Sequence, residues 1–81
     1  MMKFILHVVC VNSADAVAKM MLAVKQGNLS IQSINIHSID GGSRLSAVLL
    51  LEGEEGKGEW LANKLLNYPY YHSTSLLKTK E

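Results

Sequence analysis

Cysteine, charge and long hydrophobic runs are all scarce in this sequence of 81 residues. The single cysteine, Cys10, excludes an internal disulfide, and the sequence has no metal-ligand spacing. Charged residues make up 19% of the chain and give a formal net charge of +1. The lysines are scattered, which excludes the clustered basic surface of a nucleic-acid or anionic-membrane binder. Apolar runs such as residues 47–51 are far shorter than the ~20 residues that cross a bilayer.

Apolar residues, in contrast, make up 48% of the sequence. A chain of this length, which we expect to form a single domain over residues 1–81, buries only about 60% of the surface that its unfolded form exposes. Without disulfides or metals, association with another chain is the remaining way to stabilise so small a core. We therefore expect a partner. We also expect a cytoplasmic protein without a signal peptide, because no small-residue cleavage site follows the first residues.

The hydrophobic pattern predicts four strands and two helices. β-branched and apolar residues favour strands over residues 3–11, 29–39, 44–52 and 70–80. The first helix follows a cap at Asn12 or Ser13 and continues to about residue 26, where Gly27-Asn28 supplies a left-handed end. The second helix covers about residues 57–67, with Leu61, Leu65 and Leu66 expected to point inward, and ends before Pro69. The step from Ile31 to Ile34 breaks the alternation and predicts a bulge.

This β-α-β-β-α-β order predicts an α+β, ferredoxin-like fold: a four-stranded antiparallel sheet with two helices on one face. Two helices cover one side of a sheet, yet three of the predicted strands carry apolar residues on both sides. An uncovered apolar face indicates an interaction surface. We therefore predict an interface that includes Ile34, Ile36, Val48 and Leu50, and the pattern leaves open whether strands join edge to edge or sheets stack face to face.

Residues that could support catalysis are mostly missing. His7, His37 and His72 lie on three different predicted strands, and no carboxylate or cysteine stands at ligand spacing beside them. Cys10 has no paired base, so a buried and inert thiol is the favoured interpretation. The glycine-rich residues 53–58 lack the Gly-Lys-Ser/Thr ending of a phosphate-binding loop. We expect no catalytic residues, no metal and no cofactor.

The segment between the first strand and the first helix is the most informative one. A helix start with free N–H groups suits a carboxylate such as that of an amino acid. Residues 8–20 (VVCVNSADAVAKM) resemble an ACT-domain motif in the small regulatory subunits of acetolactate synthase, with Asn12 and Lys19 at the matching positions. Residues 30–34 (SIQSI) and 64–71 (KLLNYPYY) are similar to later elements of that family, so the resemblance covers most of the chain.

The resemblance implies a non-catalytic subunit of the short, single-ACT kind that forms a homodimer. It would bind and activate a large thiamine-diphosphate-dependent catalytic subunit in branched-chain amino-acid biosynthesis. Any amino-acid effector would bind at Asn12, Ser13, Asp15 and Ala16. Where the family commonly has glycine, this chain has Asp15, whose negative charge would compete with a ligand carboxylate, so we expect weak or absent feedback. The alternative is a free-standing ACT domain that senses an amino acid or another small ligand as a homodimer.

Overall fold

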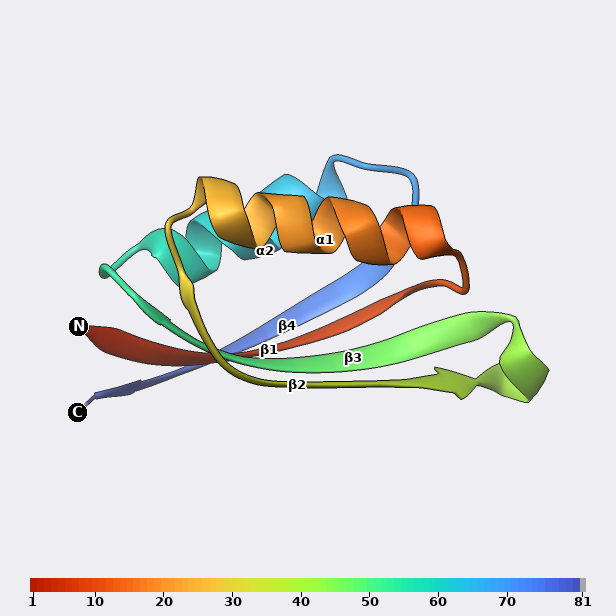
Figure 1. Cartoon of the computed structure of the whole chain (residues 1–81), viewed down its shortest axis with the longest axis horizontal. Coiled ribbons are helices and arrows are strands. Elements are labelled where there is room, and N and C mark those ends of the chain that lie inside the picture. The colour runs from red at the N-terminus through yellow and green to blue at the C-terminus, as the bar shows by residue number, and fades with distance from the viewer. Residues whose placement is uncertain (81) are drawn as a thin grey trace.

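The computed structural model describes residues 1–80, without the side chain of residue 80. Figure 1 shows its elements. They follow the predicted order: β1 (Met2–Val11), α1 (Ala14–Gln26), β2 (Ser30–Ile39), a short 3-10 turn η1 (Asp40–Gly42), β3 (Arg44–Gly53), α2 (Lys57–Leu66) and β4 (Tyr71–Lys80). The strand and helix boundaries lie within one or two residues of those that the hydrophobic pattern predicts.

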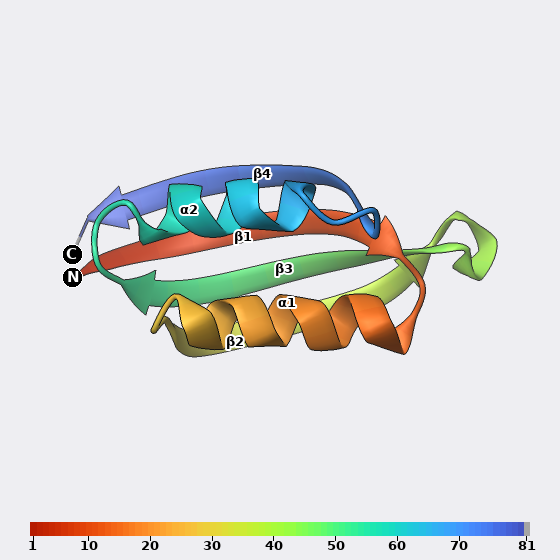
Figure 2. The ribbon, with the colours of Figure 1, turned by 90° about the horizontal axis from the view of Figure 1, so that it is seen from above.

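The four strands form one antiparallel sheet in the order β2-β3-β1-β4. Both helices lie on the same face of this sheet and run antiparallel to each other, α1 beside β2 and β3 and α2 beside β1 and β4 (Figures 1 and 2). The predicted ferredoxin-like, ACT-like fold is therefore confirmed. We call the helix-bearing side of the sheet the covered face and the other side the open face.

The core lies between the helices and the covered face. Alternate side chains of β1 point into it, and their cross-strand partners on β3 do the same, because directly paired residues share a face. The fully buried members include Phe4, Leu6, Val8, Cys10, Leu49 and Leu51 from the strands, and Met20, Val24, Leu61 and Leu65 from the helices. One layer of helices on one layer of sheet therefore buries apolar side chains of the covered face and leaves those of the open face, such as Val48 and Leu77, without a helix over them.

One detail of the predicted helices needs correction. Leu66 was expected to point inward with Leu61 and Leu65, but its side chain is 48% exposed because it lies on the outer side of the last turn of α2. The left-handed end predicted for the first helix at Gly27-Asn28 is confirmed: Asn28 has a φ of 56°, whereas Gly27 keeps helical angles. The bulge predicted near Ile31 is confirmed, because the pairing of β2 with β3 shifts register between Ile31 and Ser33.

Close contacts hold each helix on the covered face. In the first turn of α2, a Cβ added to Gly58 would lie 2.7 Å from Cδ1 of the buried Phe4, so only glycine allows this approach. On α1, the hydroxyl of Tyr71 donates a hydrogen bond of 2.5 Å to the carbonyl oxygen of Ala16. Burial raises the pKa of Tyr71 to about 12. The hydroxyl therefore remains a donor across the physiological pH range.

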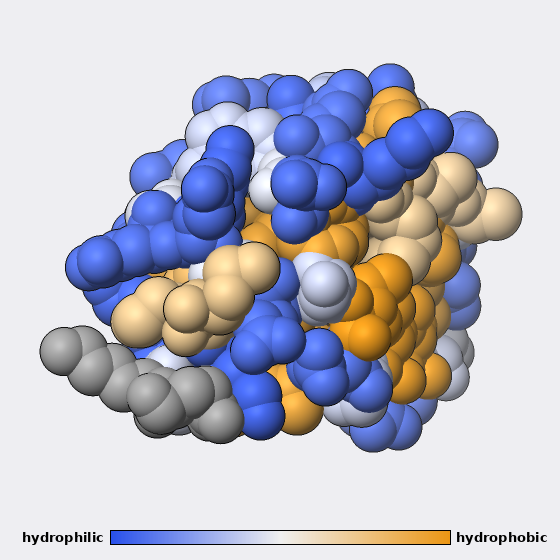
Figure 3. All heavy atoms as spheres, turned by 60° about the vertical axis from the view of Figure 1, so that its left-hand side comes forward, coloured by the Kyte–Doolittle hydropathy of each residue, from blue (hydrophilic) through white to orange (hydrophobic). Residues whose placement is uncertain are grey.

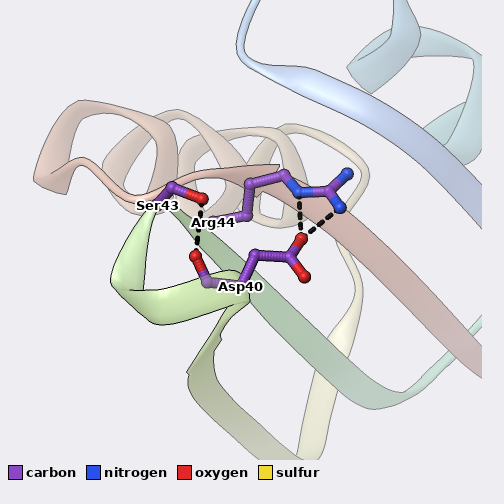
Figure 4. Close-up of polar contacts among 3 residues, drawn as sticks. All are labelled: Asp40, Ser43 and Arg44. Atoms are coloured by element: carbon purple, nitrogen blue, oxygen red, sulfur yellow. Dashed lines mark hydrogen bonds and ion pairs between the residues drawn. The ribbon is translucent and has the colours of Figure 1, made fainter.

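The turn between β2 and β3 extends beyond the helices (Figure 1). Asp40, Gly41 and Gly42 all have positive φ, of 53°, 66° and 95°. Figure 4 shows the contacts that close this turn: the hydroxyl of Ser43 donates to the carbonyl oxygen of Asp40 at 2.9 Å, and Nε of Arg44 donates to Oδ2 of Asp40 at 2.6 Å. The turn thus satisfies its own polar groups, and Arg44 closes it with an ion pair.

Candidate functional site

The loop between β1 and α1 was predicted to hold any ligand, and its polar groups are largely used within the chain. Ser13 is the N-cap of α1, with extended backbone angles, and its hydroxyl accepts a hydrogen bond of 3.2 Å from the N–H of Ala16. This is the usual role of serine at a helix start. The N–H group of Ala16, one of the predicted ligand donors, is therefore already satisfied.

Asn12 joins the loop to the β2–β3 turn. Its Nδ2 donates a hydrogen bond of 2.8 Å to the carbonyl oxygen of Gly42, and its backbone N–H donates to the carbonyl oxygen of Ser43 at 3.3 Å. Two segments that are 30 residues apart in sequence are held together by these bonds. Asn12 thus has a structural role, and its amide N–H is directed at the turn.

Asp15 lies in the first turn of α1, where its charge suits the helix dipole, as predicted. It also lines an open hollow of about 380 Å³ with Ala18, Lys19, Leu22 and Tyr70. Asp15 and Lys19 are one helical turn apart, so the hollow presents a carboxylate and an ammonium group beside an aromatic ring. Of the four predicted ligand residues, only Asp15 lines this hollow.

Three tyrosines from the end of α2 and the start of β4 pack beside the first turns of α1. The ring of Tyr71 makes edge-to-face contacts with Tyr68 and Tyr70, with centroid separations of 6.3 Å and 6.0 Å. Nζ of Lys19 lies 5.4 Å from the centroid of Tyr68, which is within cation–π range. Aromatic packing therefore orders the wall of the hollow from the β4 side.

Tyr70 and Leu22 are wall residues that the sequence analysis missed. Leu22 could have been found from its place on the same helix face, three residues after Lys19 and seven after Asp15. Tyr70 carried no such signal, because it is 55 residues beyond Asp15 and reaches the hollow only through the antiparallel pairing of β4 with β1.

The four predicted interface residues divide between the two faces of the sheet. Ile34 and Ile36 pair with Leu49 and Ala47, so they point to the covered face, near the β2 edge. Val48 and Leu50 point to the open face, where their partners on β1 are His7 and Ile5. A single flat patch cannot include all four, and the interface itself stays a prediction.

The covered side of β2 is only partly shielded by α1. Ile31 is 50% and Ile36 is 36% exposed, although both point to the helix side. In Figure 3, hydrophobic side chains gather at the right, on the flank where α1 and β2 lie. We call this flank, with Ile31, Ile34 and Ile36, the β2 flank.

The histidines and the cysteine do not assemble into a reactive centre. His7 and His37 lie on the open face, and Nε2 of His7 is 2.8 Å from the hydroxyl of Ser46. Among the described residues, no group of three histidine, cysteine or acidic side chains could hold a metal ion. Cys10 is fully buried, and burial raises the pKa of its thiol, which keeps it protonated. In residues 1–80, no helix is long and apolar enough to span a membrane.

The sheet order, the two helices on one face and the capped loop after β1 define an ACT-like fold. The sequence matches no protein-family model and no curated protein. Solved structures do match: the ACT domain of GTP pyrophosphokinase from Chlorobium tepidum has a TM-score of 0.76 at 13% identity, over 93% of this chain and 96% of that one. An ACT domain protein from Streptococcus pneumoniae has a TM-score of 0.71 at 17% identity, over 98% and 89%.

The C-terminal domain of the MgtC protein from Mycobacterium tuberculosis gives a similar match, with a TM-score of 0.75 at 12% identity, over 100% of this chain and 90% of that one. At these identities the likeness shows the fold alone. This chain therefore has the fold that ACT domains share, and its function has to be argued from its own surfaces.

Proposed function

We propose that this chain is a non-catalytic regulatory domain that acts by binding other protein chains, and that two copies pair along β2. One observation carries this proposal: β2 is an edge strand of ten residues without a single Asp, Glu, Lys or Arg. Edge strands are usually protected from pairing by charged side chains, especially lysine. The opposite edge strand, β4, has such a lysine at Lys78.

Pairing along β2 also covers the β2 flank. Two β2 strands related by a two-fold axis would join their free backbone groups into an eight-stranded sheet, with all helices on the same side. Ile31 and Ile36 of each copy would then lie against the partner's flank. The apolar surface that a core of this size leaves exposed would be shared between two chains.

A charged side chain introduced on the edge strand tests this pairing. Ile36→Lys places an ammonium group on the flank, and Leu66→Lys is the control, because Leu66 is also an exposed apolar residue but lies on α2. We expect light scattering to show that Ile36→Lys halves the mass of the wild-type assembly, while Leu66→Lys leaves it unchanged. A wild-type mass of one chain at every concentration would overturn the pairing, as would an Ile36→Lys variant that assembles normally.

The finer proposal follows from the sequence resemblance: the partner is the large, thiamine-diphosphate-dependent subunit of acetolactate synthase, and feedback by amino acids is weak or absent. The occupied N–H group of Ala16 and the structural role of Asn12 support the second part. Purified large subunit should co-elute with this chain and gain activity from it, and valine should not reverse the gain. Separate elution with unchanged activity would reject this partner and leave the pairing along β2 untouched.

A second candidate function, a free-standing amino-acid sensor, is favoured by the hollow at Asp15. The ammonium and carboxylate of an amino acid could pair with Asp15 and Lys19, and its side chain could lie on Tyr70. Calorimetry with valine, leucine and isoleucine decides between the two functions. Saturable binding that Asp15→Asn abolishes would establish the sensor, whereas no heat of binding supports the accessory function.

A further inference from the structure

A second open hollow lies on the exposed side of α2. It has a volume of about 330 Å³ and is lined by Trp60, Asn63, Lys64 and Asn67. These residues are three or four positions apart, so they form one stripe along the helix. No acidic side chain of the described residues lines it, whereas Asp15 lines the hollow on α1. We call this second site the Trp60 hollow.

Trp60 is the only tryptophan of the chain, and its ring is held in place from the side of α1. The end of α1 lies beside the start of α2 (Figure 2). A Cβ added to Gly27 would lie only 2.6 Å from Cζ3 of Trp60, so the ring packs directly on the backbone of Gly27. The side chain is half-buried, which leaves part of the ring accessible. The indole is therefore a fixed aromatic surface at the wall of the hollow.

Two lysines converge on this ring from successive turns of α2. Nζ of Lys57 lies 5.1 Å and Nζ of Lys64 lies 5.6 Å from the centroid of Trp60, and both are within cation–π range. Long side chains on a helix point back toward its start, so the ammonium group of Lys64 lies over the middle of α2. Two positive charges therefore stand beside one aromatic ring, away from the negative end of the helix dipole.

The acidic residues nearest to these lysines in the sequence do not balance their charge. Glu59, in the first turn of α2, binds Lys78 on the side of the helix that faces β4. Residues 54–55 (Glu-Glu) precede the helix. Among the described side chains, neither of them forms an ion pair with Lys57 or Lys64. The two ammonium groups are thus available to an anion from outside the chain.

The side-chain amides of Asn63 and Asn67 complete the polar lining. Both side chains are exposed, and neither makes a hydrogen bond to another described residue. In the loop between β1 and α1, by contrast, the amide of Asn12 is used to hold the β2–β3 turn. An aromatic surface with a few convergent polar groups is typical of a small-molecule site.

We propose that the Trp60 hollow binds a small ligand that joins a flat aromatic ring to a phosphate group, such as a nucleoside monophosphate. The aromatic ring of the ligand stacks on the indole, as nucleobases do on aromatic side chains. The ammonium groups of Lys57 and Lys64 leave the indole and bind the phosphate by charge-assisted hydrogen bonds. Asn63 and Asn67 bond the edge of the base, because an amide offers both a donor and an acceptor.

Charge favours this ligand over the alternatives. A phosphate monoester carries about −1.5 to −2 charges at pH 7, which two ammonium groups balance. An amino acid has an ammonium group of its own, which the cationic lining repels. A nucleic acid needs a longer basic surface than two lysines on one helix. Because α2 lies beside β1 and β4, pairing along β2 does not cover the hollow, and the site goes beyond the proposed function (Figure 2).

The single tryptophan gives a direct measurement, because a base that stacks on Trp60 quenches its fluorescence. We expect adenosine monophosphate to quench the wild type saturably, after correction with free tryptophan. Adenosine, which lacks the phosphate, and ribose 5-phosphate, which lacks the base, should each bind at least about fivefold more weakly in competition. Adenosine that binds as tightly as its monophosphate overturns the phosphate contact, and quenching that does not saturate overturns the site.

Two matched lysine variants locate the ligand. Lys64→Gln should weaken binding of adenosine monophosphate about tenfold, since it removes a charge beside Trp60. Lys19→Gln is the control, because Nζ of Lys19 lies over Tyr68 in the same way, at 5.4 Å, but lines the hollow on α1. Equal weakening by both variants, or weakening by Lys19→Gln alone, overturns the assignment to the Trp60 hollow. Ile36→Lys should bind like the wild type, so failure of this site and failure of the pairing along β2 are distinguishable.

Discussion

Leu49 and Leu50 are neighbours on β3, yet Leu49 has no exposed surface and Leu50 lies partly exposed on the open face. The chemistry of the two side chains is identical, and only the pleat of the strand separates them. The helices cover the face of Leu49. The comparison teaches that apolar content alone does not distinguish a buried face from an exposed one: on the covered face the apolar side chains are buried within the chain, and on the open face they stay partly exposed.

The largest expected effect comes from truncating each leucine in turn. Leu49→Ala should lower the free energy of unfolding by about 2–5 kcal/mol, because it leaves a cavity in the core. Leu50→Ala should cost less than about half as much in urea denaturation at low protein concentration, since no side chain packs over it there. Equal costs at low concentration would contradict the difference between the faces.

The second effect concerns how closely the helix layer approaches the covered face. Gly58→Ala should lower the free energy of unfolding by about 1–3 kcal/mol, because its new methyl group overlaps the ring of the buried Phe4. Alanine is a better helix former than glycine by about 1 kcal/mol, so this sign is opposite to the one that helix propensity predicts. Asn63→Ala, on the exposed side of the same helix, is the control and should change stability by less than about 0.5 kcal/mol. A stabilised Gly58→Ala variant would show that α2 is free to lift from the sheet.

Much of this architecture could be predicted from the sequence, because strand, turn and helix signals are local. The order of the elements, the bulge after Ile31 and the helix start at Ser13 all follow from residues near them in the chain. The face of the sheet to which each strand side chain points could not be predicted in the same way. Apolar residues occur at both odd and even positions of the strands, so the sequence pattern assigned Ile34 and Val48 to one interface. The register of the strands places these two side chains on opposite faces of the sheet.

The candidate site was predicted less completely than the fold. Asp15 lines an open hollow, whereas Asn12 and Ser13 are engaged in hydrogen bonds to Gly42 and to the helix start. Those bonds depend on the distance between two loops in the folded chain, which no local pattern records. Tyr70 was missed for the same reason, since the pairing of β4 with β1 brings it to α1.

The third effect tests the bond that holds α1 on the covered face. Tyr71→Phe removes the hydrogen bond to the carbonyl oxygen of Ala16 and should cost about 1–2 kcal/mol at neutral pH. The pKa of Tyr71 is raised to about 12 in the folded state, above its ordinary value near 10. The stability that this group contributes is therefore fully present below pH 10 and is lost as the pH rises from 10 to 12.

Urea denaturation across this pH window provides the measurement. The stability of the wild type should fall more steeply between pH 10 and 12 than that of Tyr71→Phe, and lysine deprotonation contributes equally to both. Tyr70→Phe is the control, because the hydroxyl of Tyr70 makes no comparable bond to α1 among the described residues. Parallel pH profiles for the wild type and Tyr71→Phe would contradict the assignment.

The smallest expected loss of stability comes from removing a polar contact on the open face. Ser46→Ala removes the hydrogen bond of 2.8 Å between Ser46 and Nε2 of His7. Because His7 is exposed, water replaces the lost partner, and we expect a cost of only about 0.5 kcal/mol in urea denaturation. A cost as large as that of Tyr71→Phe would mean that the open face is as tightly organised within one chain as the covered face.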